Sequence, residues 1–226
     1  MQALLAWSGG KDAAWALHAL RSRGGVEVVG LLSTVTREYE RSSMQGVRRE
    51  VLRAQAAAAG LPLLEAEIPA TCADGVYEAA MADALARAAA RWPGLRTVAF
   101  GDLFLEDIRA WRVAQLSRIG WEALTPLFGS DTGALARSMQ ADGLRAALCC
   151  VDTTQLDAAF AGRDFDAALL RDLPAGVDPC GENGEFHTCV HAGPMFAAPL
   201  HLIRGDTVLR DARFAYTDFK KGDGGS

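Results

Sequence analysis

The stretch "ALLAWSGGKDAAWALHALRSRG", residues 3–24, decides the fold of this 226-residue chain. Its apolar run at 3–7 has the length of a buried strand, and residues 12–24 have helical spacing and end at a glycine. The turn "SGGKD", residues 8–12, lies between them. Open α/β sheets bind their ligands at such turns, outside the carboxyl end of a strand. We therefore predict that the chain begins with a strand, a ligand-binding turn and a helix.

The same alternation continues through the first half of the chain. Strand-like apolar runs occur at 26–35, 61–68 and 96–102, and helical patterns occur at 46–60, 75–92 and 105–120. Strands that alternate with helices at this spacing form right-handed βαβ units around a parallel sheet. The sequence therefore predicts an α/β fold with a Rossmann-like sheet.

Beyond about residue 128 the alternation weakens. A helix at 132–142 and a strand at 145–151 are followed by loop-rich sequence and by strand-like pieces within 200–216, where Gly205-Asp206 resembles a hairpin turn. We predict two domains, a larger one at 1–128 and a smaller α+β domain at 129–219. The residues at 220–226 are predicted to form a flexible tail.

Composition narrows the classes of protein that this chain can belong to. The net charge of −5 and the absence of a basic run argue against a nucleic-acid binder. No apolar run reaches the ~18 residues of a membrane helix, and the N-terminus lacks the pattern of a signal peptide. We therefore expect a cytoplasmic protein. Its five cysteines suggest no disulfide framework, and Cys149 and Cys150 are predicted to be core thiols.

The turn at 8–12 has the properties of an anion-binding site. Two glycines let the backbone approach a ligand closely, and the N–H groups of the following helical turn favour a negative charge. Ser8 adds a hydroxyl group, Lys11 adds a positive charge, and Asp12 is suited to capping the helix or holding a metal ion. The pattern is neither a Walker A loop nor the dinucleotide-binding motif.

A second unusual stretch, "DPCGENGEFHTC" at 178–189, combines two glycines, two glutamates, a histidine and two cysteines. One interpretation is a zinc site. Its ligands would be Cys180, His187, Cys189 and His191, of which the last three would share one face of a strand. The spacing departs from that of common zinc fingers. The alternative is a glycine-rich loop that brings two carboxylates to a substrate.

"SGGKD" resembles the signature of PP-loop ATP pyrophosphatases, in which Ala13 would usually be Ser. Together with "SSMQGVRRE" (42–50), "FGDLFLEDIRAWR" (100–112), "PLF" (126–128) and the 178–188 block, it resembles the diphthine–ammonia ligase family over about residues 3–216. The bacterial branch of that family commonly has His where this chain has Gln45. The resemblance implies a HUP-type domain that splits ATP into AMP and pyrophosphate.

The resemblance also implies a set of site residues. For ATP we expect contacts from Ser8, Gly9, Gly10, Lys11, Asp12, Ser33, Met44, Gly101 and Arg109, with Asp12 and Asp102 as Mg²⁺ ligands. For the acceptor substrate we expect contacts from Gly181, Asn183, Gly184 and Thr188, and catalysis by Asp102, Glu182, Glu185 and His187.

The activity implied is an ATP-dependent amide-forming ligase. A small-molecule or protein-borne carboxylate would be adenylated, and ammonia would then displace AMP. Two alternatives remain open from the sequence: a PP-loop ATPase that acts on RNA, and an adenine-nucleotide-binding module without catalysis. Homo-oligomerisation is also left open.

Overall fold

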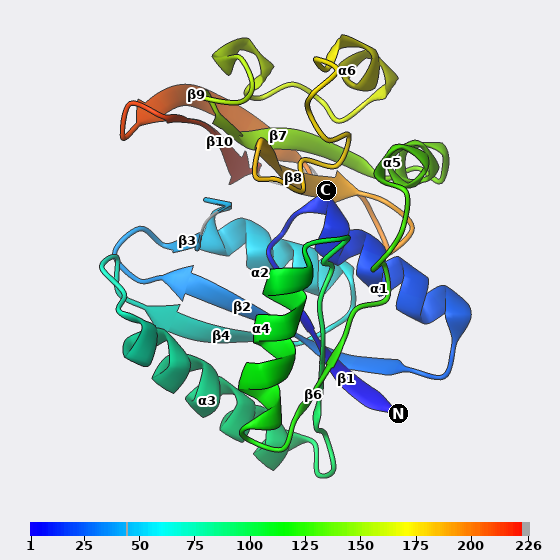
Figure 1. Cartoon of the computed structure of the whole chain (residues 1–226), viewed down its shortest axis with the longest axis vertical. Helices are drawn as coiled ribbons and strands as arrows, with labels where there is room; N and C mark the ends of the chain where they lie inside the picture. Colours follow the sequence, from blue (N-terminus) through cyan, green and yellow to red (C-terminus); the bar gives the residue numbers. More distant parts are fainter. Residues whose placement is uncertain (44, 223–226) are drawn as a thin grey trace.

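A parallel sheet, sheet A, forms the centre of the N-terminal part of the molecule (Figure 1). The computed structural model describes residues 1–43 and 45–222. The parallel strands lie in the order β4-β2-β1-β5-β6. They are β1 (Gln2–Ala6), β2 (Glu27–Thr36), β4 (Leu63–Ile68), β5 (Thr97–Ala99) and β6 (Glu122–Leu124). The predicted Rossmann-like sheet is confirmed.

A short antiparallel strand, β3 (Arg41–Ser42), pairs with Val35 and Thr36 at the end of β2. β4 already occupies one edge of β2 along residues 31–36. Because a strand has only two edges, β3 must lie on the edge that β1 uses earlier, beyond the point where β1 ends. The segment that follows β3 is thereby placed beside residues 8–12.

Helices cover both faces of sheet A. They are α1 (Lys11–Arg23), α2 (Arg49–Ala58), α3 (Asp74–Arg91) and α4 (Glu106–Ser117). Buried residues of α1 and α2 pack in the larger hydrophobic cluster, between the two sheets, and those of α3 and α4 pack in a smaller cluster on the opposite face. In the part of the chain that the structure describes, no helix is both long and apolar enough to span a bilayer.

The C-terminal part contains an antiparallel sheet, sheet B, with strand order β8-β7-β10-β9. Its strands are β7 (Arg145–Asp152), β8 (Phe186–Ala192), β9 (Leu202–Arg210) and β10 (Phe214–Lys221). The helices α5 (Thr132–Ala141) and α6 (Ala167–Asp172) and a short 3₁₀ helix, η1 (Ala158–Phe160), accompany them. This agrees with the predicted smaller α+β region.

Two sequence-based predictions about this region are wrong. β9 runs straight through Gly205-Asp206, and the hairpin turns instead at Asp211 and Ala212, whose φ angles are +51° and +49°. The predicted tail also begins too early, because Lys220 and Lys221 pair with β9. Residues 223–226 lie outside the described part of the chain.

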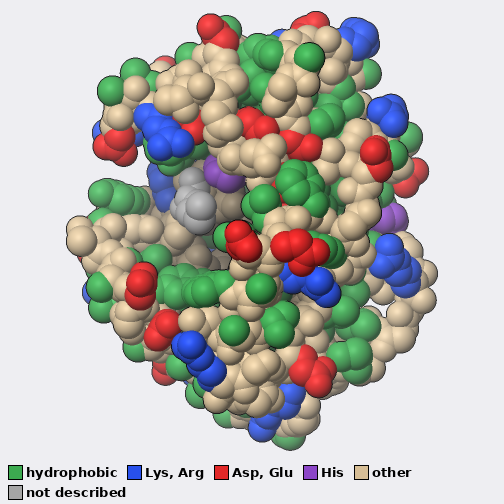
Figure 2. Space-filling view, viewed as in Figure 1, with side chains coloured by type: hydrophobic (Ala, Val, Ile, Leu, Met, Phe, Trp, Pro, Cys, Tyr) green, Lys and Arg blue, Asp and Glu red, His purple; other side chains and the backbone are tan. Residues whose placement is uncertain are grey.

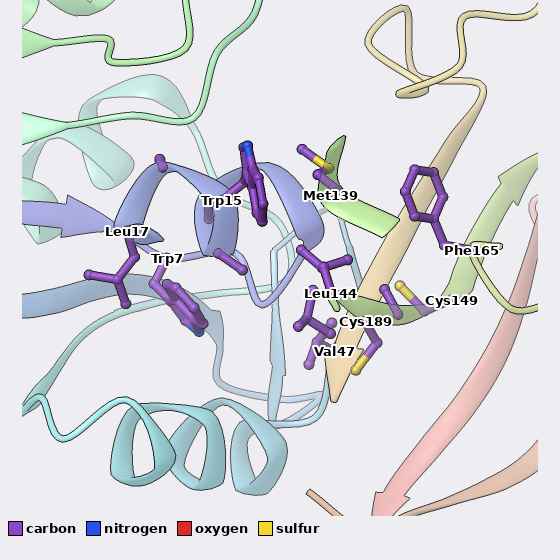
Figure 3. Packing of buried hydrophobic residues seen from close by; sticks show 14 of the residues in the cluster. Trp7, Trp15, Leu17, Val47, Met139, Leu144, Cys149, Phe165 and Cys189 are labelled. Carbon is purple, nitrogen blue, oxygen red and sulfur yellow. The ribbon is translucent and has the colours of Figure 1, made fainter. Parts of the chain in front are cut away.

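Sheet A and sheet B share one hydrophobic core (Figure 3). Trp7, Leu17 and Val47 from the N-terminal part belong to the same buried cluster as Leu144 and Cys189 from the C-terminal part. The predicted core thiols are confirmed, because Cys149 and Cys150 are buried. The two parts are therefore held together by burial of apolar surface, which is the dominant favourable term in folding.

Candidate active site

A cavity of about 310 Å³ lies where the carboxyl ends of β1 and β5 meet sheet B. Figure 2 shows the molecule hollowed between its upper and lower parts. Of the residues predicted from sequence, the wall includes Ser8, Gly10, Lys11, Asp12, Gly101, Asp102, Gly181, Glu182, His187 and Thr188. The two stretches "SGGKD" and "DPCGENGEFHTC", which are about 170 residues apart in sequence, therefore face one cavity.

The backbone of "SGGKD" bends sharply into α1. Gly9 has a φ of +84°, and a Cβ atom there would lie 2.9 Å from the side chain of Leu52. Only glycine adopts this conformation in this space without strain. Gly10 precedes the first turn of α1 and has no side chain to cap it. The positive end of the helix dipole is therefore directed at the cavity wall.

The C-terminal part supplies the missing helix cap. The hydroxyl oxygen of Thr188 in β8 accepts the backbone N–H of Lys11 at 3.0 Å. Two residues further along β8, the backbone N–H of Val190 donates to the carbonyl of Gly9 at 3.0 Å. Thr188, predicted as a substrate contact, thus fixes the "SGGKD" turn through its side chain.

Gln55 of α2 also joins the "SGGKD" turn to β8. A role for this residue was not predicted from the sequence. Its side chain is fully buried, and its amide nitrogen donates to the carbonyls of Gly9 (3.0 Å) and Val190 (2.7 Å). Its amide oxygen accepts the indole N–H of Trp7 at 2.9 Å. The available signal was a glutamine on the apolar stripe of a helix, since such a group must be hydrogen-bonded when buried.

The end of β3 at Ser42 and the segment after it, through Ser43 and Gln45, form another part of the wall. The Arg41 guanidinium donates to the carbonyl of Gly46 at 2.8 Å, and the thiol of Cys149 contacts the carbonyl of Gln45 at 3.3 Å. Contacts from both parts of the chain therefore hold this segment. Met44, predicted as a nucleotide contact, lies outside the described residues.

The residues after β5 approach the first turn of α1 very closely. A Cβ atom on Gly101 would lie 2.7 Å from the carbonyl carbon of Asp12, so a larger residue would push the two segments apart. Asp102 forms an ion pair with Arg112 of α4, with 2.8 Å between Nε and Oδ2. Arg112 also stacks on the ring of Phe100 at 4.2 Å. Asp102 and Arg112 both line the cavity.

Arg109, the other arginine considered for this helix, does not line the cavity. Its guanidinium stacks on Phe128 at 4.6 Å and lies 3.7 Å from Glu106 on the surface. The prediction of Arg109 as a nucleotide contact is therefore not supported by its position. Arg112 is the cation of α4 that lies beside the cavity.

The two glutamates of the second stretch have different environments. Glu182 lines the cavity and accepts the backbone N–H of Leu103 at 2.8 Å. Partial burial raises the pKa of Glu182 to about 7, and the nearby Asp12 acts in the same direction. A carboxylate with a pKa near neutrality is suited to accept a proton.

Glu185 is buried within the loop instead. Its carboxylate accepts the backbone N–H groups of Asp178 (2.9 Å) and Asn183 (3.0 Å), and the side-chain amide of Asn183 (3.1 Å). Glu185, Asn183 and Gly184 are not part of the cavity wall. Their predicted roles in catalysis and substrate contact are not supported by this geometry, which makes Glu185 the residue that holds the loop in shape.

His187 and the cysteines do not form a metal-binding group. No cluster of three or more His, Cys, Asp or Glu side chains that could hold a metal ion occurs among the residues described. Burial lowers the pKa of His187 to about 4, so the imidazole in the cavity wall is neutral near pH 7. Burial raises the pKa of the Cys180 and Cys189 thiols to about 12. The zinc interpretation gains no support from this arrangement.

Comparison with protein families accounts for nearly the whole chain. Residues 1–120 match the diphthamide synthase N-terminal domain, and residues 131–222 match the diphthamide synthase C-terminal domain. The chain belongs to the diphthamide synthase family. This confirms the resemblance to diphthine–ammonia ligases. A comparison with curated proteins found no match.

Both diphthamide synthase domains contribute to the cavity, and strand alternation decides which residues of β2 reach it. Leu32 and Thr34 line the cavity, whereas Ser33 points to the opposite face and donates its hydroxyl to the carbonyl of Trp7 at 2.5 Å. Ser33, predicted as a nucleotide contact, is therefore part of the buried framework. Tyr77 and Met81 of α3 also line the cavity and were not predicted.

The position of Glu185 in the C-terminal diphthamide synthase domain leads to a stability prediction. In Glu185→Gln an NH₂ group replaces one carboxylate oxygen and faces backbone N–H donors. We expect the melting temperature to fall by roughly 3–10 °C, because a buried donor is left without an acceptor. Thermal unfolding followed by circular dichroism measures this shift. A melting temperature equal to that of the wild type would show that Glu185 does not hold the loop.

Proposed function

We propose that this chain is an ATP-dependent amide-forming ligase that adenylates a carboxylic acid and transfers it to ammonia. Membership in the diphthamide synthase family indicates a ligase that uses ATP. The observation that carries this proposal is the shared cavity, which is lined both by the N-terminus of α1 and by Glu182. An anion-binding wall and a proton acceptor are what the two half-reactions require.

The wall around "SGGKD" fits the phosphates of ATP. The start of α1, the hydroxyl of Ser8 and the guanidinium of Arg112 lie on the same cavity, and each favours a negatively charged ligand. Asp12 and Asp102 are also in this wall, and Mg²⁺ in nucleotide sites takes one or two carboxylates plus phosphate oxygens. Bound there, Mg²⁺ would neutralise charge on the phosphates.

In the first half-reaction an oxygen of the substrate carboxylate attacks the α-phosphorus of ATP. The new oxygen–phosphorus bond gives an acyl-adenylate, and the bond to the β-phosphate breaks to release pyrophosphate. In the second half-reaction the nitrogen of ammonia attacks the acyl carbon, AMP leaves, and one proton passes from nitrogen to the carboxylate of Glu182. The cavity walls limit contact of the activated acid with water.

The experiment that tests this proposal measures the products of ATP. Purified protein is incubated with ATP, Mg²⁺, ammonium chloride and a panel of carboxylic acids, and nucleotides are separated by chromatography. We expect AMP and pyrophosphate to form in equal amounts when an acid and ammonium are both present. Release of ADP, or release of AMP that ignores both acid and ammonium, would contradict an amide-forming ligase.

The two arginines of α4 provide a matched pair of variants. Arg112→Ala should lower kcat/KM for ATP about 10–100-fold, because a charge-assisted contact beside the phosphates is lost. Arg109→Ala should stay within about twofold of wild type, because its exposed ion pair contributes little. Steady-state kinetics with varied ATP measures both. Equal losses in the two variants would mean that the cation beside the cavity has no special role.

A further inference from the structure

Lys11 belongs to the cavity wall, but its ammonium group is engaged by contacts within the protein. It is 1 % exposed, and its ammonium group donates to both carboxylate oxygens of Asp12, at 3.0 and 2.9 Å. It also donates to the backbone carbonyl of Cys180. These contacts use the hydrogen-bonding capacity of the ammonium group. The predicted role of Lys11 as a free positive charge for phosphate is therefore not supported.

Two aromatic rings complete the surroundings of this ammonium group. The nitrogen lies 5.7 Å from the ring centre of Phe165 and 5.5 Å from that of Phe186. Aromatic faces attract cations at such distances, and more strongly when water is excluded. The carboxylate of Asp12, at hydrogen-bonding distance, favours the charged form of the ammonium group as these rings do. The side chain is therefore a permanent buried cation.

The partners of this cation come from segments that are far apart in the sequence. Asp12 belongs to α1, whereas Phe165, Cys180 and Phe186 belong to the C-terminal domain. The residue that follows Cys180 by two positions is Glu182. The contact that holds the carbonyl of Cys180 against α1 therefore also holds the nearby backbone of Glu182, whose side chain lines the cavity.

We propose that Lys11 is a positioning residue, whose ammonium group joins the nucleotide-binding turn to the loop at 180–186 and so places Glu182 opposite the phosphates. It acts by charge through Asp12 and the Cys180 carbonyl, and it does not touch ATP. This inference deepens the proposed function and rests on it for the role of Glu182. The contact between the two loops stands independently of that function.

A variant with chemical rescue tests the role of the charge. Lys11→Ala removes the side chain beyond Cβ, and n-propylammonium replaces the missing three carbons and the nitrogen. We expect the variant to melt about 10 °C lower than wild type, because Asp12 loses its buried partner. Millimolar n-propylammonium should restore at least half of that loss. The neutral isostere n-propanol, used at equal concentration, should not.

Three outcomes of this experiment would overturn the proposal. Equal rescue by n-propanol would mean that Lys11 only fills space. Unchanged melting, together with a more than tenfold loss of inorganic pyrophosphate binding by calorimetry, would make Lys11 a phosphate ligand. No rescue of a folded variant by the amine would mean that no ammonium-binding contact exists. None of these readings requires turnover, so they stay distinct from a failure of the proposed ligase activity.

Lys11→Met, which keeps the length of the side chain, gives a second measurement if Lys11→Ala does not fold. The charges that face Glu182 are those of Lys11 and Asp12 from α1, and the N–H group of Leu103 donates to it from the segment after β5. Loss of the Lys11 charge should move the pH profile of AMP formation to higher pH and lower kcat at least tenfold, with KM for ATP little changed. A raised KM with an unmoved pH profile would contradict a positioning role.

Discussion

Substitution of Glu182 by glutamine is expected to lower the rate of AMP formation about 100- to 10,000-fold, the range typical of a lost general base. ATP binding should change little, because glutamine keeps an oxygen that can accept the N–H of Leu103. The test compares kcat for AMP release with the dissociation constant for ATP measured by calorimetry. A variant that retains more than about a tenth of the wild-type kcat would remove Glu182 from the proton transfer.

The pH dependence follows from the same residue. Glu182 accepts a proton only when it is ionised, so the wild-type rate should rise through its pKa of about 7 and level off above it. In Glu182→Gln this limb of the profile should disappear. A limb that persists near pH 7 in the variant would assign it to another group.

Glu182 affects stability and rate in opposite directions: as the pH rises through its pKa, the rate increases and the stability of the folded protein decreases. Its pKa is raised in the folded protein above the ordinary value of 4.5, so the folded state binds the proton more tightly than the unfolded state. The wild type therefore loses stability as the pH rises from about 4.5 to about 7. Glu182→Gln should melt no lower than wild type at pH 8, in contrast to Glu185→Gln, and the pair separates catalytic from structural carboxylates.

Gln55→Leu is expected to have a large effect on stability. Leucine leaves the indole N–H of Trp7 and the carbonyl of Val190 buried without their hydrogen bonds. Each unsatisfied buried group costs about 1–3 kcal/mol, so the free energy of unfolding should fall by roughly 3–5 kcal/mol. Urea denaturation measures this loss, and the melting temperature should fall by about 10 °C.

Gln140 provides the matched control for this prediction. Its side-chain nitrogen is also buried, but it makes no hydrogen bond within the described residues. Gln140→Leu removes a buried nitrogen that has no partner among the described residues, so the stability of this variant should stay within about 0.5 kcal/mol of wild type or exceed it. If Gln55→Leu costs no more than Gln140→Leu, the network around Gln55 does not hold the "SGGKD" turn.

The sequence predicted the fold well because its signals are periodic or local. Apolar runs and helical spacing located sheet A, and the glycines of "SGGKD" marked the first turn. The hairpin was misplaced because Gly205-Asp206 has the composition of a turn, whereas the turn forms at Asp211 and Ala212. Composition alone does not locate the turn when cross-strand register depends on tertiary contacts.

The site was harder to predict, because the rotation of each helix about its axis and the conformation of each loop decide which side chains reach the cavity. Arg109 and Arg112 lie three residues apart on one helix, and only the roll of α4 places Arg112 beside Asp102. Glu182 and Glu185 lie in a loop without any period, so their opposite orientations had no signature. Gln55 acts through partners 46 and 135 residues away, which a local pattern cannot reveal.

The hydrogen bond between Lys11 and Thr188 has a consequence for biosynthesis. Its two partners are separated by 177 residues in the sequence. Because ribosomes add roughly 5–20 residues each second, Thr188 is synthesised roughly 10–35 s after Lys11. Throughout that interval the apolar faces of α1 and α2 that later meet sheet B are uncovered. The newly made N-terminal domain therefore carries exposed apolar surface that makes it prone to association, and its "SGGKD" turn is completed only as the last third of the chain is released.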